Sequence, residues 1–265
     1  METNNNQWLN LSGKTALVTG GTKGIGLAIA QRLSQAGARV IVSARTQPTD
    51  SEAAHHFIAA DLTKADDVTK LAQQINEQYG GVDILINNVG GLTTPPGGHS
   101  TLTDALWEQE IQLNLISATR LDRILLPQML QKQNGVIIHI SSVSGKQALW
   151  NLNMAYAVSK AALNSYSKAL ATELATQGVR VITVAPGATK TPMMEGFIQE
   201  FATSQGLSYD DGLKQLLVQI GGIPMGRMAE PEEVAALVHF LVSPSAAYLT
   251  GSIYAIDGGS LPVVS

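Results

Sequence analysis

The stretch KTALVTGGTKGIG, residues 14–26, decides the fold of the chain. Residues 14–19 have the apolar character of a buried strand, and a helical pattern begins at about Gly24. The turn between them is rich in glycine, which lets the backbone approach a phosphate, and the start of the following helix offers free N–H groups. The stretch therefore predicts the first strand–turn–helix unit of an α/β fold, with a phosphate-binding turn.

Short apolar runs and helical patterns alternate along the rest of the chain. Further strands are predicted at residues 39–43, 57–60, 83–86, 136–140, 179–184 and 252–256. Helices are predicted at residues 24–36, 63–79, 104–131, 155–176 and 231–242. Val/Ile runs separated by helices are typical of parallel strands covered on both faces, joined by right-handed crossovers. We therefore predict one domain over residues 1–265, an α/β doubly wound Rossmann-type parallel sheet of about seven strands with helices on both faces.

The bulk composition indicates a folded chain with few charges. Of its 265 residues 45% are apolar and 14% are charged, the net charge is −4, and there is no cysteine. Lys and Arg are scattered, the His residues lack metal-ligand spacing, and the polar start does not resemble a signal peptide. The apolar runs also fall short of the roughly 18 residues that span a bilayer. We expect a cytoplasmic protein with no metal and no nucleic-acid or membrane partner.

The residues after the second predicted strand indicate which dinucleotide the turn binds. NAD enzymes place an acidic residue there to accept hydrogen bonds from the ribose 2′-hydroxyl, but this chain has Ala44 followed by Arg45. A guanidinium binds a phosphate with two hydrogen bonds, and Lys23 adds a second positive charge in the turn. These residues favour NADP, although both are also typical of solvated surface charges.

A second motif indicates acid–base chemistry. Tyr156 and Lys160 lie four residues apart and share one face of a predicted helix, where an ammonium would lower the pKa of a phenol. Such a tyrosine serves as a general acid or base. Ser142 follows the fifth predicted strand, where a hydroxyl donates a hydrogen bond to a carbonyl oxygen; Ser141 and Ser144 are the alternatives, as turn hydroxyls.

Taken in order, these motifs resemble the short-chain dehydrogenase/reductase family from about residue 11 to residue 260. The resemblance implies a catalytic set of Asn114, Ser142, Tyr156 and Lys160. It implies that NADP is bound by Gly20, Thr22, Lys23, Gly24, Ile25, Gly26, Arg45, Asp61, Leu62, Asn88, Gly90, Tyr156, Lys160, Pro186, Gly187, Thr189 and Thr191. Two departures are Val89, in place of a smaller residue, and one extra residue between Ser142 and Tyr156.

The resemblance also implies a mechanism. Hydride passes between the nicotinamide and a carbonyl carbon, Tyr156 donates the proton, and Ser142 steadies the oxygen. Lys160 lowers the pKa of Tyr156, binds the nicotinamide ribose, and relays protons through a water held near Asn114. The expected activity is that of an oxidoreductase acting on a small carbonyl or alcohol.

Several alternatives stay open at this point. For an oxidoreductase, the substrate is a ketone of a broad-range carbonyl reductase, a 3-oxoacyl thioester, or a sugar or polyol. The alternative functions are a non-catalytic NADP-binding protein, an epimerase and a dehydratase. Residues 193–222 are predicted to form a substrate lid. Within it, Met193, Met194 and Phe197 form either the core of a small helical lid or an apolar wall over the substrate, and we favour the second interpretation. The family resemblance implies a homotetramer or a homodimer, paired through the helices after the fourth and fifth strands.

Overall fold

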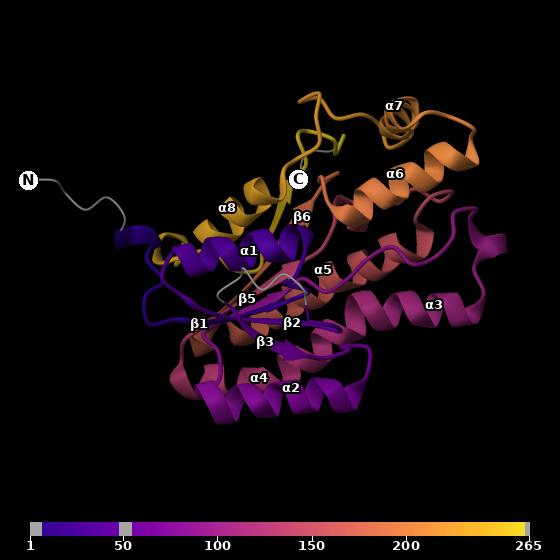
Figure 1. Cartoon of the computed structure of the whole chain (residues 1–265). Helices are drawn as coiled ribbons and strands as arrows, with labels where there is room; N and C mark the ends of the chain where they lie inside the picture. The colour runs from indigo at the N-terminus through magenta and orange to yellow at the C-terminus, as the bar shows by residue number, and fades with distance from the viewer. Residues whose placement is uncertain (1–6, 48–54, 263–265) are drawn as a thin grey trace, which may run out of the picture.

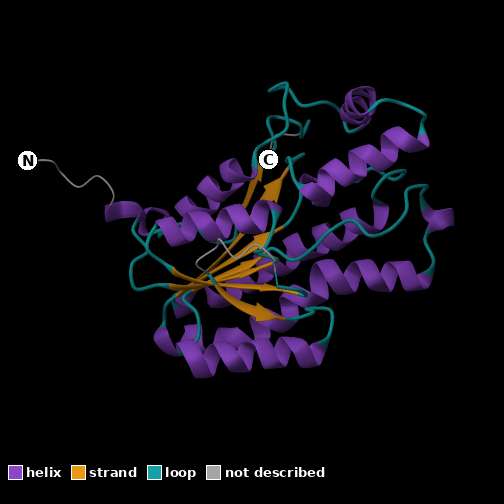
Figure 2. Ribbon diagram, in the orientation of Figure 1, coloured by secondary structure: helices purple, strands orange, loops and turns teal. Residues whose placement is uncertain are grey.

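A computed structural model describes residues 7–47 and 55–262 of the chain. Its centre is a parallel sheet of seven strands in the order β3-β2-β1-β4-β5-β6-β7 (Figure 2). The strands are β1 (Thr15–Thr19), β2 (Arg39–Ala44), β3 (His56–Ala59), β4 (Ile84–Asn87), β5 (Gly135–Ile140), β6 (Val179–Pro186) and β7 (Ile253–Ile256). The predicted doubly wound sheet is confirmed, and its strand order reverses between β1 and β4.

Helices cover both faces of the sheet (Figure 1). On one face α1 (Gly24–Gln35) and α8 (Pro231–Val242) bury apolar side chains against the strands. On the other, a second apolar cluster joins the sheet to α2 (Ala65–Tyr79), α4 (Ser117–Lys132) and α5 (Met154–Leu174). The inner strands β1, β4 and β5 are buried on both sides, which explains their continuous apolar sequences. None of the helices in the described ranges is long and apolar enough to cross a membrane.

The predicted helix over residues 104–131 is present, but it is not α-helical throughout. The structure has α3 (Asp104–Ile111), a π turn (Gln112–Ile116) and then α4. Within the π turn the Asn114 side chain is buried and exchanges hydrogen bonds with the backbone of Gly91 on another loop. A π turn accommodates one extra residue without ending the helix, and it is often found at functional sites.

Two helices of the chain stand away from the sheet, at the upper right of Figure 1. They are α6 (Pro192–Ser204) and α7 (Tyr209–Gln219), and they lie within the predicted lid. Leu152, Ile198, Leu216 and Met228 form the centre of their own apolar cluster. Pairing between Thr189 and Ala229 joins the two ends of this segment.

The hydroxyl of Thr19 joins β1 to β4 where the strand order reverses. It donates to the Ile86 carbonyl at 3.2 Å and accepts from the backbone N–H groups of Asn88 at 2.9 Å and Val89 at 3.0 Å. The Asn88 amide in turn donates to the carbonyls of Thr19 at 2.9 Å and Gly20 at 3.3 Å. These bonds fix the glycine turn to the segment that follows β4.

We predict that Thr19→Val lowers the free energy of unfolding by about 1–3 kcal/mol, because the isosteric methyl leaves the Val89 N–H without its acceptor and the Asn88 N–H with only the Ile86 carbonyl. Thr15→Val is the matched control, since this threonine of the same strand is buried and its hydroxyl bonds to no other described residue. Urea unfolding measures both changes. Equal stability of the two variants would contradict the role given to the Thr19 hydroxyl.

Candidate active site

The glycine turn is shaped so closely that side chains are excluded from it. Gly20 and Gly24 have φ angles of +63° and +53°, in the left-handed region that favours glycine. A Cβ on Gly26 would lie 2.2 Å from the Gly20 carbonyl oxygen and 2.5 Å from the Asn88 amide nitrogen. The N-cap residue of α1, Lys23, forms no side-chain cap, so its side chain leaves the first N–H groups of the helix available to an anion.

The other residues predicted to bind NADP in and near the glycine turn differ in their exposure and packing. Thr22 is half-buried, Lys23 is exposed, and Ile25 packs against the core beneath α1. Thr191 caps the start of α6 by accepting from the Met194 N–H at 3.2 Å, and a Cβ on Gly24 would lie 3.2 Å from its methyl group. The start of α6 therefore lies against the glycine turn.

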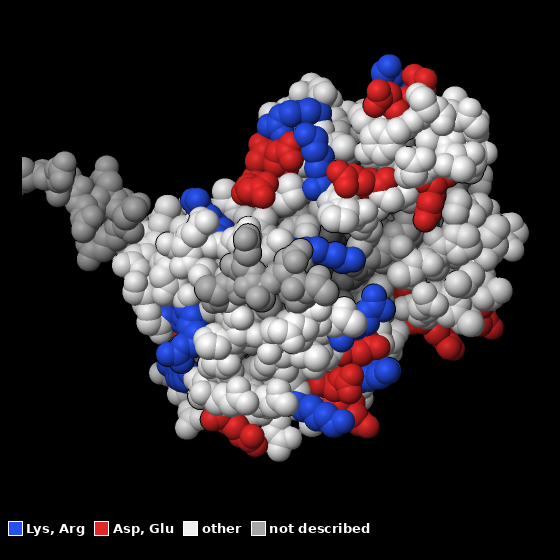
Figure 3. Space-filling model, viewed as in Figure 1, with Lys and Arg blue, Asp and Glu red and all other residues white. Residues whose placement is uncertain are grey.

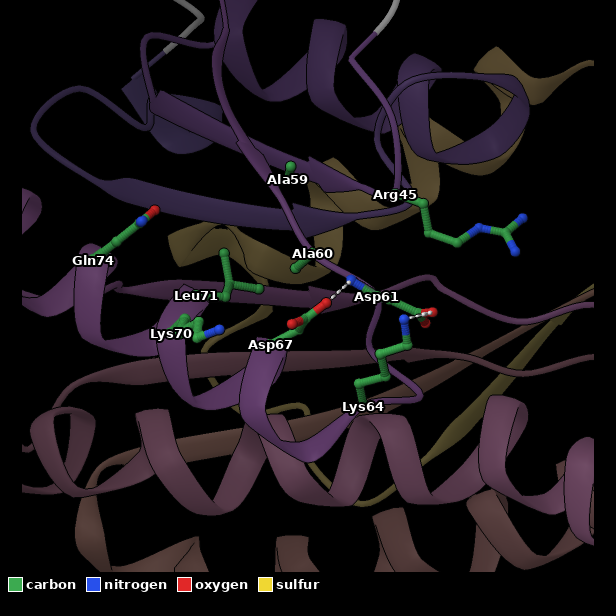
Figure 4. A pocket seen from close by; sticks show the side chains of 9 residues that line it. All are labelled: Arg45, Ala59, Ala60, Asp61, Lys64, Asp67, Lys70, Leu71 and Gln74. Atoms are coloured by element: carbon green, nitrogen blue, oxygen red, sulfur yellow. Dashed lines mark hydrogen bonds and ion pairs between the residues drawn. The ribbon is translucent and has the colours of Figure 1, made fainter.

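A polar hollow of about 340 Å³ lies beyond the ends of β2 and β3 (Figure 4). Arg45, Asp61 and Lys64 line one side of it, and Lys70 and Gln74 the other. Partial burial raises the pKa of the Asp61 carboxyl, but hydrogen bonds from Thr63 and the charges of Lys64 and Arg45 outweigh that effect and hold it below its usual value.

The hollow thus brings Arg45 and Asp61 together, with the neighbouring Leu62 buried in the core. Lys23 does not line this hollow, and neither its ammonium nor the Arg45 guanidinium forms an ion pair with another described residue.

The serines after β5 have different partners. Ser141 donates to the Lys160 carbonyl at 3.3 Å, which ties the strand end to α5. Ser144 bonds through its N–H to the Ser142 hydroxyl at 3.1 Å, and the same Ser142 hydroxyl lies near enough to the Tyr156 phenol to lower its pKa. Of the three, Ser142 is therefore the one whose hydroxyl meets the phenol.

Tyr156 and Lys160 lie one turn apart on α5. The Lys160 side chain is buried, its Nζ donates to the Ile140 carbonyl at 2.9 Å, and the Nζ lies 5.7 Å from the centre of the Tyr156 ring. Burial lowers the pKa of Lys160 to about 8, a fall that the charge of Glu110 partly offsets.

The pKa of Tyr156 moves in the direction opposite to the one predicted. The pKa rises to about 12: burial is the largest cause, the Ser142 hydroxyl acts against the rise, and the charge of Glu110 adds to it. Burial disfavours phenolate, and the Lys160 ammonium bonds to a backbone carbonyl instead of to the phenol. The tyrosine is therefore protonated at neutral pH, in the form that donates a proton.

Asn114 and Lys160 converge on the backbone of Gly90. A Cβ at Gly90 would lie 2.7 Å from the Asn114 Oδ1 and 2.8 Å from the Lys160 Nζ. Sequence reasoning missed a further member of this group, Glu110, which is fully buried and bonds to Asn114. Its signal is the spacing of four residues before Asn114, which places the two side chains on one face of the helix.

The segment after β6 lies beside the end of β7. Pro186 pairs with Ile256, and the Gly187 N–H donates to the Ile256 carbonyl at 3.0 Å. Thr189 is buried and donates to the Gly187 carbonyl at 3.2 Å. These contacts hold the chain between the sheet and the start of α6.

The three apolar residues at the start of the predicted lid differ in their packing. Met194 and Phe197 are partly buried and pack against the cluster shared by α6 and α7, and their place in a wall over the substrate stays a prediction. Met193 is exposed, and a Cβ on Gly91 would lie 3.0 Å from its terminal methyl. Met193 therefore covers the loop that carries Gly90, on which Asn114 and Lys160 converge.

The surface around the site carries no broad field of one sign. Figure 3 shows acidic and basic side chains in small mixed clusters on this face, with a hollow near its centre bordered by basic side chains.

Comparison with known families gives one extended match. Residues 20–260 match the family model described as enoyl-(acyl carrier protein) reductase. The chain is 35% identical over 258 residues to the 3-oxoacyl-(acyl-carrier-protein) reductase FabG of Vibrio cholerae, covering 95% of this chain and 98% of that protein. The FabG protein of Escherichia coli is 36% identical over 259 residues, with the same coverage of both chains.

Solved structures show the same similarity. L-sorbose reductase from Gluconobacter frateurii, solved with NADPH and L-sorbose, superposes with a TM-score of 0.88 at 33% identity, covering 97% of this chain and 100% of that one. A single-residue variant of actinorhodin polyketide ketoreductase, solved with NADPH, gives a TM-score of 0.85 at 32% identity, covering 93% and 97%.

We predict that Gly26→Ala weakens dinucleotide binding by at least about tenfold, because the added methyl meets the fixed backbone of Gly20 and forces the turn open. Gly196→Ala in α6 is the control: nothing lies within 4 Å of its added Cβ, and the helix should gain up to about 1 kcal/mol. Fluorescence titration and thermal unfolding measure the two effects. Unchanged binding by the Gly26 variant would show that the turn does not hold the dinucleotide.

Proposed function

We infer the function of the chain from its family: it belongs to the short-chain dehydrogenase/reductase family. It is an oxidoreductase that uses NADP(H) to interconvert a carbonyl compound and an alcohol. We propose that Ser142, Tyr156 and Lys160 carry this chemistry, with Asn114 as the fourth member of the set. The observation that supports the proposal is a buried lysine whose Nζ lies 5.7 Å from the ring of a protonated tyrosine, with a serine hydroxyl near the phenol.

The residues present fit an NADP cofactor. A Cβ at Gly26 would clash with the Gly20 carbonyl, and a Cβ at Gly90 would clash with the side chains of Asn114 and Lys160. Both positions therefore require glycine, and both lie where the proposed cofactor binds. We assign the pyrophosphate to the turn from Gly20 to Gly26 and the 2′-phosphate to Arg45, aided by Lys23. Asp61, Leu62, Asn88, Pro186, Gly187, Thr189 and Thr191 complete the proposed binding set, together with Thr22 and Ile25.

NADPH, when bound, supplies the hydride for the carbonyl carbon. In reduction, the Tyr156 hydroxyl donates its proton to the substrate oxygen, and the Ser142 hydroxyl donates a hydrogen bond to the same oxygen as negative charge develops. The phenol is protonated at neutral pH, which is the form that this direction needs. Lys160, held beneath Gly90 with Asn114, is placed to restore the proton to Tyr156.

The substrate lies between Tyr156 and the exposed apolar residues Met193 and Trp150 in this proposal. A screen that follows NADPH oxidation with ketones, 3-oxoacyl thioesters and sugars identifies its class, with NADH as the control. Consumption of NADPH excludes a non-catalytic binding protein, and it separates the proposal from an epimerase or a dehydratase, which consume no net cofactor.

We also propose that the chain works in the cytoplasm as a homotetramer or homodimer, paired through α4 and α5. Apolar side chains on this face, including Ile124, Leu126 and Leu130, are only partly buried in the chain described here. Light scattering in solution measures the assembly, and a monomer would contradict this part of the proposal. The role of residues 193–222 as a substrate lid is likewise a proposal, supported by the separate apolar cluster of α6 and α7.

We predict that Tyr156→Phe lowers kcat by about 10²–10⁴-fold, because the variant has no proton to donate. NADPH affinity should stay within about threefold, since the ring and Lys160 are retained. Tyr248→Phe, at a fully exposed tyrosine, is the control and should keep full activity. Steady-state kinetics and NADPH titration measure both; an active Tyr156 variant would remove the tyrosine from the mechanism.

We predict that Arg45→Asp shifts the ratio of kcat/KM for NADPH over NADH by at least about tenfold toward NADH, because a carboxylate repels the 2′-phosphate that a guanidinium binds. Arg39→Asp lies at the opposite end of the same strand and should leave the ratio unchanged. If the wild-type enzyme prefers NADH, the assignment of Arg45 to the phosphate is wrong.

A further inference from the structure

Glu110 is a charged side chain at the centre of the site that the reaction described above does not use. It lies in the last turn of α3, and its side chain is fully buried. Burial of a carboxylate costs several kcal/mol unless donors and opposite charges surround it. The contacts of Glu110 therefore identify the groups that hold the charge there.

Two neutral neighbours donate hydrogen bonds to the Glu110 carboxylate. One oxygen accepts from both the N–H and the hydroxyl of Thr93, on the loop after β4. The other accepts from the Asn114 Nδ2 at 3.2 Å. The same Nδ2 donates to the carbonyls of Glu110 and Gly91, so the amide nitrogen of Asn114 is turned toward α3.

The orientation of the amide nitrogen also fixes the position of the Asn114 Oδ1. Its Oδ1 accepts from the Gly91 N–H at 2.9 Å and points to the backbone of Gly90. The Lys160 Nζ lies against the same point, within 2.8 Å of the position that a Cβ of Gly90 would take. Glu110 thus presents the Asn114 carbonyl oxygen, and not its NH2 group, toward the lysine.

Among the residues that the structure describes, the ionisable groups that act on Glu110 and on each other lie on α3 and α5. Burial raises the pKa of Glu110, whereas the hydrogen bonds from Thr93 and Asn114 and the charge of Lys160 lower it. In return the carboxylate raises the pKa of Lys160 and that of Tyr156. The remaining neighbours of the Lys160 amine, the Ile140 carbonyl and Asn114, are neutral.

We propose that Glu110 is a positioning residue of the reaction: a buried anion that orients Asn114 and keeps Lys160 charged beside Tyr156. The inference rests on the proposed function, because it assigns Glu110 a role toward the same lysine and tyrosine. It differs from a purely structural link between α3 and the loop after β4, which needs the hydrogen bonds of Glu110 but not its charge.

The variant Glu110→Gln removes the charge and keeps the size of the side chain. Loss of the anion lowers the pKa of both Lys160 and Tyr156, so the alkaline limb of kcat for carbonyl reduction should move to lower pH by roughly half a unit to one unit. We expect kcat to fall about tenfold as well, because Asn114 loses an acceptor and turns more freely. Glu110→Asp keeps the charge, so its alkaline limb should stay at the wild-type pH even where kcat falls.

Glu108→Gln is the matched control, because Glu108 is an exposed glutamate on the same helix. It should change neither kcat nor the pH of the alkaline limb of the kcat profile. Thermal unfolding of each variant establishes that it is folded. A limb that stays in place in folded Glu110→Gln, or moves equally in Glu110→Asp, would overturn the inference and leave only a structural link.

A second readout does not depend on turnover. NMR of the lysine side-chain carbons, with the Lys160 signal assigned by its loss in Lys160→Met, gives the pKa of Lys160 directly. We expect Glu110→Gln to lower that pKa and Glu110→Asp to preserve it; equal values in wild type and Glu110→Gln would contradict the inference. A wild-type protein that reduces no carbonyl with NADPH would refute the proposed function instead, while the NMR titration would still decide the role of Glu110.

Discussion

The structure depends most on the hydrogen bonds that Thr19 and Asn88 make across the point where the strand order reverses. Parallel strands on either side of this point carry their crossovers in opposite directions, so their ends separate and open a crevice. Thr19 and Asn88 keep the ends of β1 and β4 in contact at its base. They hold the glycine turn on one side, and on the other they fix the start of the segment that carries Gly90, on which Asn114 and Lys160 converge.

In the site, the backbone and the side chains have different roles. The backbone supplies the cofactor turn, where side chains are excluded, and helices α3 and α5 supply the ionisable groups. Burial raises the pKa of the Tyr156 phenol and lowers the pKa of Lys160. A lysine that is buried but still hydrogen-bonded is suited to passing protons, because its two forms are closer in free energy at neutral pH than those of an exposed lysine.

Much of this organisation could be predicted from the sequence. The seven strands and the glycine turn have strong local patterns, and the motifs around Ser142 and Tyr156 stand in the order of a known family. The π turn at Gln112–Ile116 could not be predicted, because its apolar spacing continues that of the flanking helices. Glu110 was missed because a charged residue in a helix suggests exposure, and only the tertiary fold shows that Thr93 and Asn114 surround it. The raised pKa of Tyr156 also depends on burial, which spacing along a helix does not reveal.

The central claim is that Ser142, Tyr156 and Lys160 meet at the reacting end of a bound dinucleotide. A crystal structure of the protein with NADP and a substrate alcohol or ketone tests it most directly. The account predicts that the substrate oxygen lies about 2.6–3.2 Å from both the Tyr156 and the Ser142 hydroxyl oxygens, with the nicotinamide beside Lys160. A complex in which the substrate oxygen contacts neither hydroxyl, or in which the dinucleotide lies away from Lys160, would contradict it.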